Sequence, residues 1–403
     1  MSEYQHIRQL LAAHRGETAL PFGFYGGELQ HRVDLEHLWY REWLFAGHDC
    51  ELLRPGDNLT LQVGAYPVLI VRDAAGRLRA FHNTCRHRGS RLCADAHGSA
   101  PRLTCPYHGW TYRLDGSLIA APHMGPGFDP SGLALRRVHC ETVAGFIFIC
   151  VAADPPDFGP LRELAEPYLL PHALRDAKVA CEVTIIENAN WKHVLENNRE
   201  CYHCGSNHPE LLRSFPNQPT VTGTPGGTDG GRLEAFWQAC EARGLPARYR
   251  LSANLQTRLM RLPLVDGARS LTLSGQAAVA RALADSLTSA DIGSQLFYHY
   301  PSTWNHVLAD HAVTFRLLPL SPTRTQLTTR WLVHRDAVEG IDYDAATLTA
   351  VWRATNAQDQ RICEENQIGT LSPAYAPGPL SALEEQGVSQ FLEWYCRTLG
   401  QRL

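Results

Sequence analysis

The chain has 403 residues, of which 44% are hydrophobic and 19% are charged, and its formal net charge is −4. This length suits two domains, or one core with an appended module. The mild acidity and the absence of a Lys/Arg cluster argue against nucleic-acid binding, and the longest apolar run, 143–153, is well short of the roughly 20 residues that span a bilayer. The polar start, MSEYQHIRQLL, lacks the apolar core of a signal peptide, so we expect a cytoplasmic protein whose twelve cysteines form no disulfide framework.

The first predicted element is a helix over residues 33–45, with Asp34 as its N-cap. Short strand-like runs separated by turns follow as far as residue 151; the clearest lie at 59–64, 66–73, 78–83 and 145–151. Three prolines within 152–161 then mark a boundary. We therefore expect a helical lead-in over 1–45 and an all-β module over 46–155.

The remaining residues, 156–403, read as a mixed α+β domain in which antiparallel strands pack against a long helix. A Gly/Pro-rich stretch at 215–231 is predicted to be a mobile surface loop, and a helix is predicted over 344–369, closed by Gly369. Strand-like runs occur at 181–191, 270–275, 296–301, 312–320 and 325–334.

Within the all-β module, Cys85 and His87 form one short motif, and Cys105 and His108 form a second, CPYHGW. Zinc fingers usually group two cysteines and then two histidines, whereas here each loop supplies one thiol and one imidazole. A [2Fe–2S] centre with two thiolates on one iron and two imidazoles on the other needs this mixed ligation. The pattern resembles the Rieske cluster motif; a structural zinc site and ordinary turns are the alternatives.

A second group of candidate ligands lies in ENNRECYHCGSNHPEL, 196–211, which contains Glu200, His203 and His208. Two histidines and one carboxylate hold iron in non-haem oxygenases and leave positions open for O2 and substrate. Zinc could not use electrons from a neighbouring cluster. We interpret Cys201 and Cys204 as packing residues, because thiolates are oxidisable beside an O2-activating iron.

The carboxylate ligand is left open by the residues themselves. Glu200 lies three residues before His203, on the same side of a helix. The late helix offers three further candidates: Asp359, Glu364 and Glu365.

Together the two motifs resemble the catalytic subunits of Rieske non-haem iron ring-hydroxylating oxygenases over nearly the full chain. The resemblance implies a catalytic domain of the helix-grip type and Asp359 as the third ligand of a mononuclear Fe(II). It also implies that Glu200 bridges to a Rieske histidine of a neighbouring subunit in a homotrimer. Most of the family has aspartate at the bridge, and glutamate suggests its quaternary-ammonium branch. A separate NAD(P)H-dependent flavin/iron–sulfur reductase is expected, because we find no dinucleotide-binding fingerprint.

Four segments are similar to glycine betaine monooxygenases and stachydrine demethylases: 196–211, 236–252, 261–279 and 377–395. This similarity implies oxidative N-demethylation with release of formaldehyde. A quaternary ammonium needs aromatic faces, for which the candidates are Tyr202, Tyr298, Tyr300 and Trp304. Hydroxylation of an aromatic acid on the same iron site, or electron transfer by a carrier whose second metal site is structural, are the alternatives.

Overall fold

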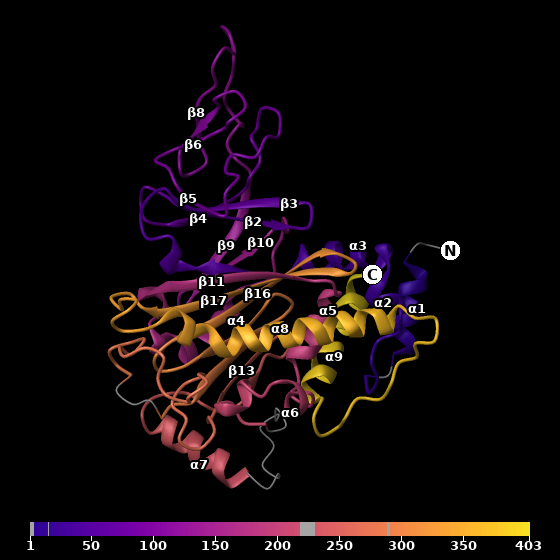
Figure 1. Ribbon diagram of the computed structural model, residues 1–403. Coiled ribbons are helices and arrows are strands. Elements are labelled where there is room, and N and C mark those ends of the chain that lie inside the picture. Colours follow the sequence, from indigo (N-terminus) through magenta and orange to yellow (C-terminus); the bar gives the residue numbers. More distant parts are fainter. Residues whose placement is uncertain (1–3, 15, 218–229, 288–290) are drawn as a thin grey trace. The chain divides into compact units, whose positions relative to one another are not determined.

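The computed structural model describes residues 4–14, 16–217, 230–287 and 291–403. The chain divides into two compact units: Trp39–Phe158 forms one, and Met1–Leu38 together with Gly159–Leu403 forms the other (Figure 1). The residues predicted as a separate lead-in, 1–45, are therefore divided between the two units. The reason is that α1 (Gln5–Ala13) packs against α9 (Gln386–Arg402) and α2 (Gly23–Gly26) packs against α8 (Ala345–Thr370), both near the C-terminus.

The Trp39–Phe158 unit is all-β, as predicted. Its larger sheet has the strand order β1-β10-β9-β4-β3-β2-β5, and a small sheet has the order β6-β7-β8. All five residues of β10 are buried, which explains why this run is continuously apolar rather than alternating. The strands are β1 (Leu44–His48), β2 (Asp57–Val63), β3 (Tyr66–Arg72), β4 (Leu78–His82), β5 (His97–Ser99), β6 (Leu103–Thr104), β7 (Thr111–Tyr112), β8 (Leu118–Ala120), β9 (Arg137–Val143) and β10 (Phe146–Cys150).

The helix predicted over 33–45 is confirmed only as far as Trp39, and Asp34 as its N-cap is wrong. Helix α3 (Glu28–Asp34) ends at Asp34, a π-helical turn continues to Trp39, and β1 begins at Leu44. The Asp34 carboxylate is buried and forms an ion pair of 2.5 Å with the buried Lys192. A buried charge needs an opposite charge, so this tertiary contact outweighs the preference of aspartate for helix starts.

The other unit is built on a seven-stranded antiparallel sheet with the order β11-β17-β16-β15-β14-β13-β12. Successive strands from β12 to β17 are neighbours, and β11 joins the edge beside β17. This arrangement confirms the predicted α+β class. The strands are β11 (Ala177–Glu187), β12 (Arg250–Leu251), β13 (Thr257–Leu262), β14 (Ser294–His299), β15 (Thr303–Val307), β16 (Ala312–Ser321) and β17 (Arg324–His334).

The strand predicted at 270–275 is absent, since these residues form turns. The Ser270 hydroxyl donates to the buried Asp310 carboxylate at 2.8 Å, and the Asp310 carboxylate also accepts from the Ala278 N–H. These bonds hold the segment by side-chain contacts, so its backbone needs no strand partner.

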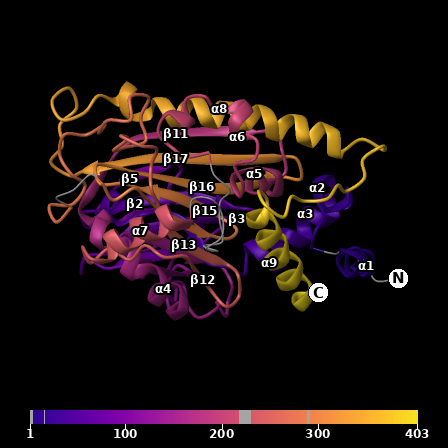
Figure 2. The same cartoon turned by 90° about the horizontal axis from the view of Figure 1, so that it is seen from below.

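Helix α8 (Ala345–Thr370) is the long helix expected near the C-terminus, and it packs against α5 and β11 (Figure 2). Asp344 caps it, accepting a hydrogen bond from Thr347 N–H at 2.8 Å. The helix continues through Gly369, which is therefore not the residue that ends it. The other helices are α4 (Gly159–Leu169), α5 (Trp191–Asn198), α6 (Cys204–Asn207), α7 (Gly230–Glu241) and α9 (Gln386–Arg402).

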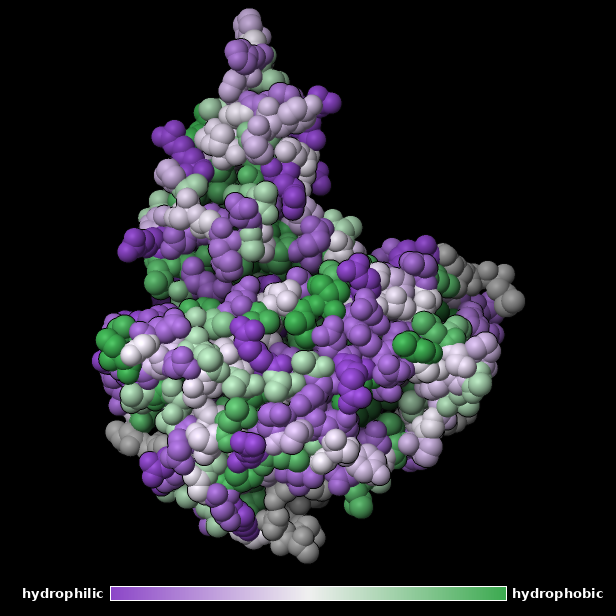
Figure 3. All heavy atoms as spheres, in the orientation of Figure 1, coloured by the Kyte–Doolittle hydropathy of each residue, from purple (hydrophilic) through white to green (hydrophobic). Residues whose placement is uncertain are grey.

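The surface loop predicted at 215–231 falls largely outside the described residues, which resume at the start of α7. Among the helices of the described residues, none is both long and apolar enough to cross a bilayer. Hydrophobic and hydrophilic residues are intermixed on the face drawn in Figure 3.

Candidate functional site

The four predicted cluster ligands lie on two loops of similar geometry. In each loop a glycine N–H donates to the carbonyl of a cysteine four residues earlier, Gly89 to Cys85 and Gly109 to Cys105, both at 3.0 Å. The glycine φ angles are +80° and +72°, a region that glycine adopts without steric cost. Each loop therefore turns back tightly just after its histidine.

The two loops bury their thiols and expose their imidazoles. Cys85 and Cys105 are buried, whereas His87 and His108 are exposed, with ring centroids 4.7 Å apart. The Tyr112 hydroxyl lies 3.4 Å from Cys85 Sγ, and burial followed by this contact raises the pKa of Tyr112. A buried thiol pair beside an exposed imidazole pair fits a [2Fe–2S] cluster whose inner iron takes the thiolates and whose outer iron takes the imidazoles.

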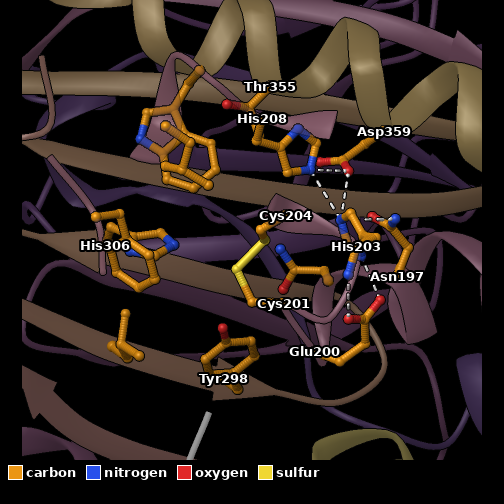
Figure 4. A pocket seen from close by; sticks show the side chains of 15 residues that line it. Asn197, Glu200, Cys201, His203, Cys204, His208, Tyr298, His306, Thr355 and Asp359 are labelled. Atoms are coloured by element: carbon orange, nitrogen blue, oxygen red, sulfur yellow. Dashed lines mark hydrogen bonds and ion pairs between the residues drawn. A yellow bond between two sulfur atoms is a disulfide. The ribbon is translucent and has the colours of Figure 1, made fainter. Parts of the chain in front are cut away.

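In the larger unit, three possible ligand atoms converge where α6 faces α8. The Nε2 atoms of His203 and His208 lie 2.9 Å apart, and Asp359 Oδ1 lies 3.3 Å from the first and 3.0 Å from the second (Figure 4). Two ligand atoms that are each about 2.1 Å from one ion and at a right angle lie about 3.0 Å apart. These spacings therefore fit a single metal ion.

The other nitrogen of each imidazole has its own partner. His203 Nδ1 lies 2.5 Å from Glu200 Oε1, and His208 Nδ1 lies 2.8 Å from Gln358 Oε1. An Nδ1–H that donates to an oxygen leaves the Nε2 lone pair free for a metal. Since two facing lone pairs repel each other, a cation between them stabilises the arrangement.

Protons and a metal ion compete for these Nε2 atoms. Burial alone would lower the pKa of His203, but hydrogen bonds with Asp359 and Glu200 outweigh burial and raise it to about 9. Burial would raise the pKa of Asp359, and the contacts with the two histidines hold it below its usual range instead. The carboxylate is thus ionised and suited to a cation.

A single-turn helix, rather than a continuous one, separates the two histidines. His203 is the N-cap of α6 and His208 is its C-cap. Gly205 lies inside α6, and Pro209 directly follows the second cap. The two histidines point to the same place because they stand at opposite ends of this short turn.

The three ligand atoms border a cavity with about 460 Å³ of empty space, part of it open to solvent. Its apolar wall consists of Leu211, Phe215, Leu296, Tyr298, His306 and Trp352. Burial, with the nearby His311, lowers the pKa of His306 to about 3, so this imidazole is neutral at physiological pH. The wall opposite the carboxylates is therefore aromatic and largely uncharged.

Of the four aromatic residues predicted to contact substrate, Tyr298 lines this cavity and the other three lie elsewhere. Tyr202 is 65% exposed, because the chain turns outward directly after Glu200. Tyr300 is buried, and its hydroxyl accepts a hydrogen bond of 2.5 Å from Arg199 Nε. Trp304 is buried against Phe315, with ring centroids 5.1 Å apart.

Cys201 and Cys204, interpreted from the sequence as packing residues, form a disulfide across the loop that carries His203 (Figure 4). Cys204 Sγ lies within 4.8 Å of possible ligand atoms of His203 and His208. Its bond to Cys201 leaves no thiolate for a metal. The ten other cysteines, all within the described residues, form no disulfide.

Several residues at the site were not singled out from the sequence. Gln358 supports His208, and its Nε2 donates to Glu210 at 2.7 Å. Glu187 ends β11 in the core, where burial and then the charge of Asp359 raise its pKa to about 8. Gln358 could have been found from the sequence, because it stands next to the predicted ligand Asp359. Phe215 and Trp352 could not, because they reach the cavity from segments that are far apart in the chain.

Comparisons with known proteins agree with this geometry. The family model "Ring hydroxylating alpha subunit (catalytic domain)" matches residues 173–401, and the "Rieske [2Fe-2S] domain" model matches 42–142. The chain is 45% identical to a glycine betaine monooxygenase oxygenase subunit of Pseudomonas aeruginosa (strain UCBPP-PA14) over 94% of this chain and 88% of that protein. It is 43% identical to the Chromohalobacter salexigens protein of the same name, over 98% of this chain and 88% of that one.

Solved structures share the fold at lower identity. The quaternary ammonium Rieske monooxygenase CntA in complex with gamma-butyrobetaine matches with a TM-score of 0.72 at 22% identity, over 97% of this chain and 98% of that one. Naphthalene 1,2-dioxygenase from Rhodococcus sp. matches with a TM-score of 0.73 at 17% identity, over 98% and 99%. The chain therefore belongs to the family of Rieske oxygenase α subunits and is a Rieske non-haem iron monooxygenase, which uses a [2Fe–2S] cluster, a mononuclear iron and O2.

Proposed function

We propose that the enzyme removes an N-methyl group from a quaternary ammonium compound of the glycine betaine or proline betaine type and releases formaldehyde. The observation that carries the proposal is the cavity in which the ligand atoms of His203, His208 and Asp359 face an aromatic, uncharged wall. The two bacterial relatives named for glycine betaine support this substrate class.

The cavity wall suits a cation that cannot form hydrogen bonds. A quaternary nitrogen carries no proton, so aromatic faces within about 6 Å are the means of stabilising it. Phe215, His306 and Trp352 lie in contact, with centroids 5.5 Å apart for the first two and 4.6 Å apart for the last two. An N-methyl group resting on this wall would face the two histidines.

His203, His208 and Asp359 would hold the mononuclear iron, which supplies O2 activation when bound. Glu200 and Gln358 keep the two rings in the orientation and tautomer that present Nε2. The apolar wall keeps water away from the reacting carbon.

The chemistry balances with two electrons. One oxygen atom of O2 replaces a hydrogen of the N-methyl group to give a hydroxymethyl group, and the other leaves as water with two protons and two electrons. The C–N bond of the hydroxymethyl compound then breaks, its electron pair stays on nitrogen, and loss of the hydroxyl proton gives formaldehyde. The electrons require a separate NAD(P)H-dependent reductase.

Electrons would enter through the [2Fe–2S] cluster held by Cys85, His87, Cys105 and His108. Glu200 has a second role in this proposal, which is to bridge to a cluster histidine of a neighbouring chain in a homotrimer. One oxygen of the Glu200 carboxylate lies 2.5 Å from His203 Nδ1, and only 12% of the Glu200 side chain is exposed. A carboxylate that accepts from imidazoles on both sides gives a short path between the two metal centres.

A single-turnover experiment tests the reaction. The purified protein is reduced chemically, freed of reductant, and mixed with O2 and glycine betaine, proline betaine or an aromatic acid in separate reactions, and formaldehyde is measured. We expect formaldehyde from a betaine alone. Reoxidation of the cluster with an aromatic acid, without formaldehyde from either betaine, would instead assign ring hydroxylation to the site.

A further inference from the structure

Two buried arginines lie around Tyr298, which lines the cavity. The guanidinium carbons of Arg199 and Arg258 are 4.4 Å and 4.6 Å from the centre of the Tyr298 ring. The Tyr298 hydroxyl points into the cavity (Figure 4). A concentration of positive charge therefore stands directly behind the cavity wall.

The fold brings these arginines together from distant segments. Arg258 on β13 is the direct partner of Tyr298 on β14, and directly paired residues of antiparallel strands project from the same face of a sheet. Arg199 follows the last residue of α5 and immediately precedes Glu200. The same loop thus supplies the metal end of the cavity with a carboxylate and the tyrosine end with a cation.

Neither guanidinium has an anionic partner among the described residues. Arg258 is 1% exposed, and none of its three side-chain nitrogens has a hydrogen-bond partner. Arg199 is fully buried; its Nε donates to Tyr300 and its Nη2 donates to Gln390, while its Nη1 has no partner. Burial and then the neighbouring charge of Arg199 lower the pKa of Arg258.

Buried cations without counterions are costly, and contact with an aromatic ring compensates only in part. Two other buried arginines of this sheet have closer protein partners: Arg330 forms an ion pair with Glu182, and Arg261, although without an anionic partner among the described residues, donates to the Ile292 carbonyl and lies 3.0 Å from His172 Nε2. The missing counterion of Arg199 and Arg258 would have to come from outside the described chain.

We propose that Arg199 and Arg258, with the Tyr298 hydroxyl between them and the cavity, form the subsite for the carboxylate of the substrate. This inference rests on the proposed function, since a betaine joins a quaternary ammonium to a carboxylate. The two guanidiniums attract the carboxylate and repel the ammonium, so a zwitterion is oriented with its N-methyl groups toward His203, His208 and Asp359. The subsite makes the enzyme selective for methylated ammonium compounds that also carry an acid group.

Binding measurements on the oxygen-free holoenzyme test the subsite without turnover. Glycine betaine and choline are a matched pair, because choline has a CH2OH group where the betaine has a carboxylate. In Arg258→Met we expect the Kd for glycine betaine to rise by about 10- to 100-fold, because the buried charge behind Tyr298 no longer attracts the carboxylate. The Kd for choline should stay the same or fall, because a repelling charge is gone.

Three further variants sharpen the comparison. Arg258→Lys keeps the charge and should recover part of the affinity for glycine betaine. Arg199→Gln removes the second guanidinium and should change the two Kd values in the same directions as Arg258→Met. The test therefore does not depend on the folding of a single variant. Arg261→Met is the matched control: it lies on the same strand and is fully buried, but it faces the opposite side of the sheet, and both Kd values should be unchanged.

Equal changes in the Kd of both ligands, or an unchanged Kd for glycine betaine in both charge-removing variants, would overturn the proposal. So would a wild-type enzyme that binds no betaine. A wild-type enzyme that binds glycine betaine with the expected dependence on Arg258, but releases no formaldehyde, would refute the proposed reaction while supporting the subsite.

Discussion

Replacing Asp359 with alanine is the most direct test of the mononuclear iron centre. The carboxylate oxygen lies 3.0 Å and 3.3 Å from the two imidazole nitrogens, and in Asp359→Ala only two neutral imidazoles remain there to bind the metal. Loss of an outer hydrogen-bond partner of a metal ligand typically weakens metal binding by about 10- to 100-fold. Loss of the anionic ligand itself should therefore weaken Fe(II) binding by more than about 100-fold.

The assay is a metal count on protein reconstituted without oxygen and then desalted. Iron and acid-labile sulfide are measured per chain, together with the visible absorption of the cluster. Asp359→Ala should lose one iron per chain and keep its sulfide and its colour, because the cluster ligands lie in the other unit. Glu365→Ala is the matched control, since Glu365 is exposed on the same helix, and it should retain all of its iron.

Full iron occupancy in Asp359→Ala would refute the reasoning. The third ligand would then have to be Glu364 or Glu365. In the structure, Glu364 Oε1 instead accepts hydrogen bonds from the backbone and side chain of Asn188, at 2.9 Å and 3.0 Å.

Glu200→Gln should retain both metal centres but lower turnover by about 10- to 100-fold, because an amide cannot accept hydrogen bonds from imidazoles on both sides as a carboxylate does. Unchanged turnover would exclude a bridging role. Cys201→Ser and Cys204→Ser should each leave Fe(II) bound, since neither sulfur is a free thiolate, and loss of iron in either variant would make a cysteine part of the site. Burial raises the pKa of Glu196 from 4.5 to about 8, so the folded state keeps a proton that the unfolded state has released. The free energy of unfolding should therefore fall as the pH rises from 4.5 toward 8, by up to about 1.4 kcal/mol per pH unit. Glu196→Gln cannot ionise, so its thermal unfolding should show less of this decline. An equal decline in both proteins would contradict the raised pKa of Glu196.

Features that depend on the local order of residues could be predicted from the amino-acid sequence. The two loops with one cysteine and one histidine each, the alternating or fully apolar strands, and the helix beginning at Asp344 all follow from spacings within a few residues. Local spacing also predicted that His203 and His208 belong to one site. Such features depend on backbone geometry that repeats in every protein, and so they can be inferred before the fold is known.

Which side chains from distant segments come into contact depends on the three-dimensional fold. Helical periodicity allowed Asp359, Glu364 and Glu365 alike, and the packing of α8 against α5 and β11 brings Asp359 to the histidines. The same holds for Asp34, which faces a buried lysine rather than capping a helix, and for Arg258, whose register opposite Tyr298 places an unpaired charge behind the cavity. The energetic cost of each of these charged side chains depends on its burial and on its partner. Both depend on residues that are far away in the chain, so they cannot be inferred from the local sequence.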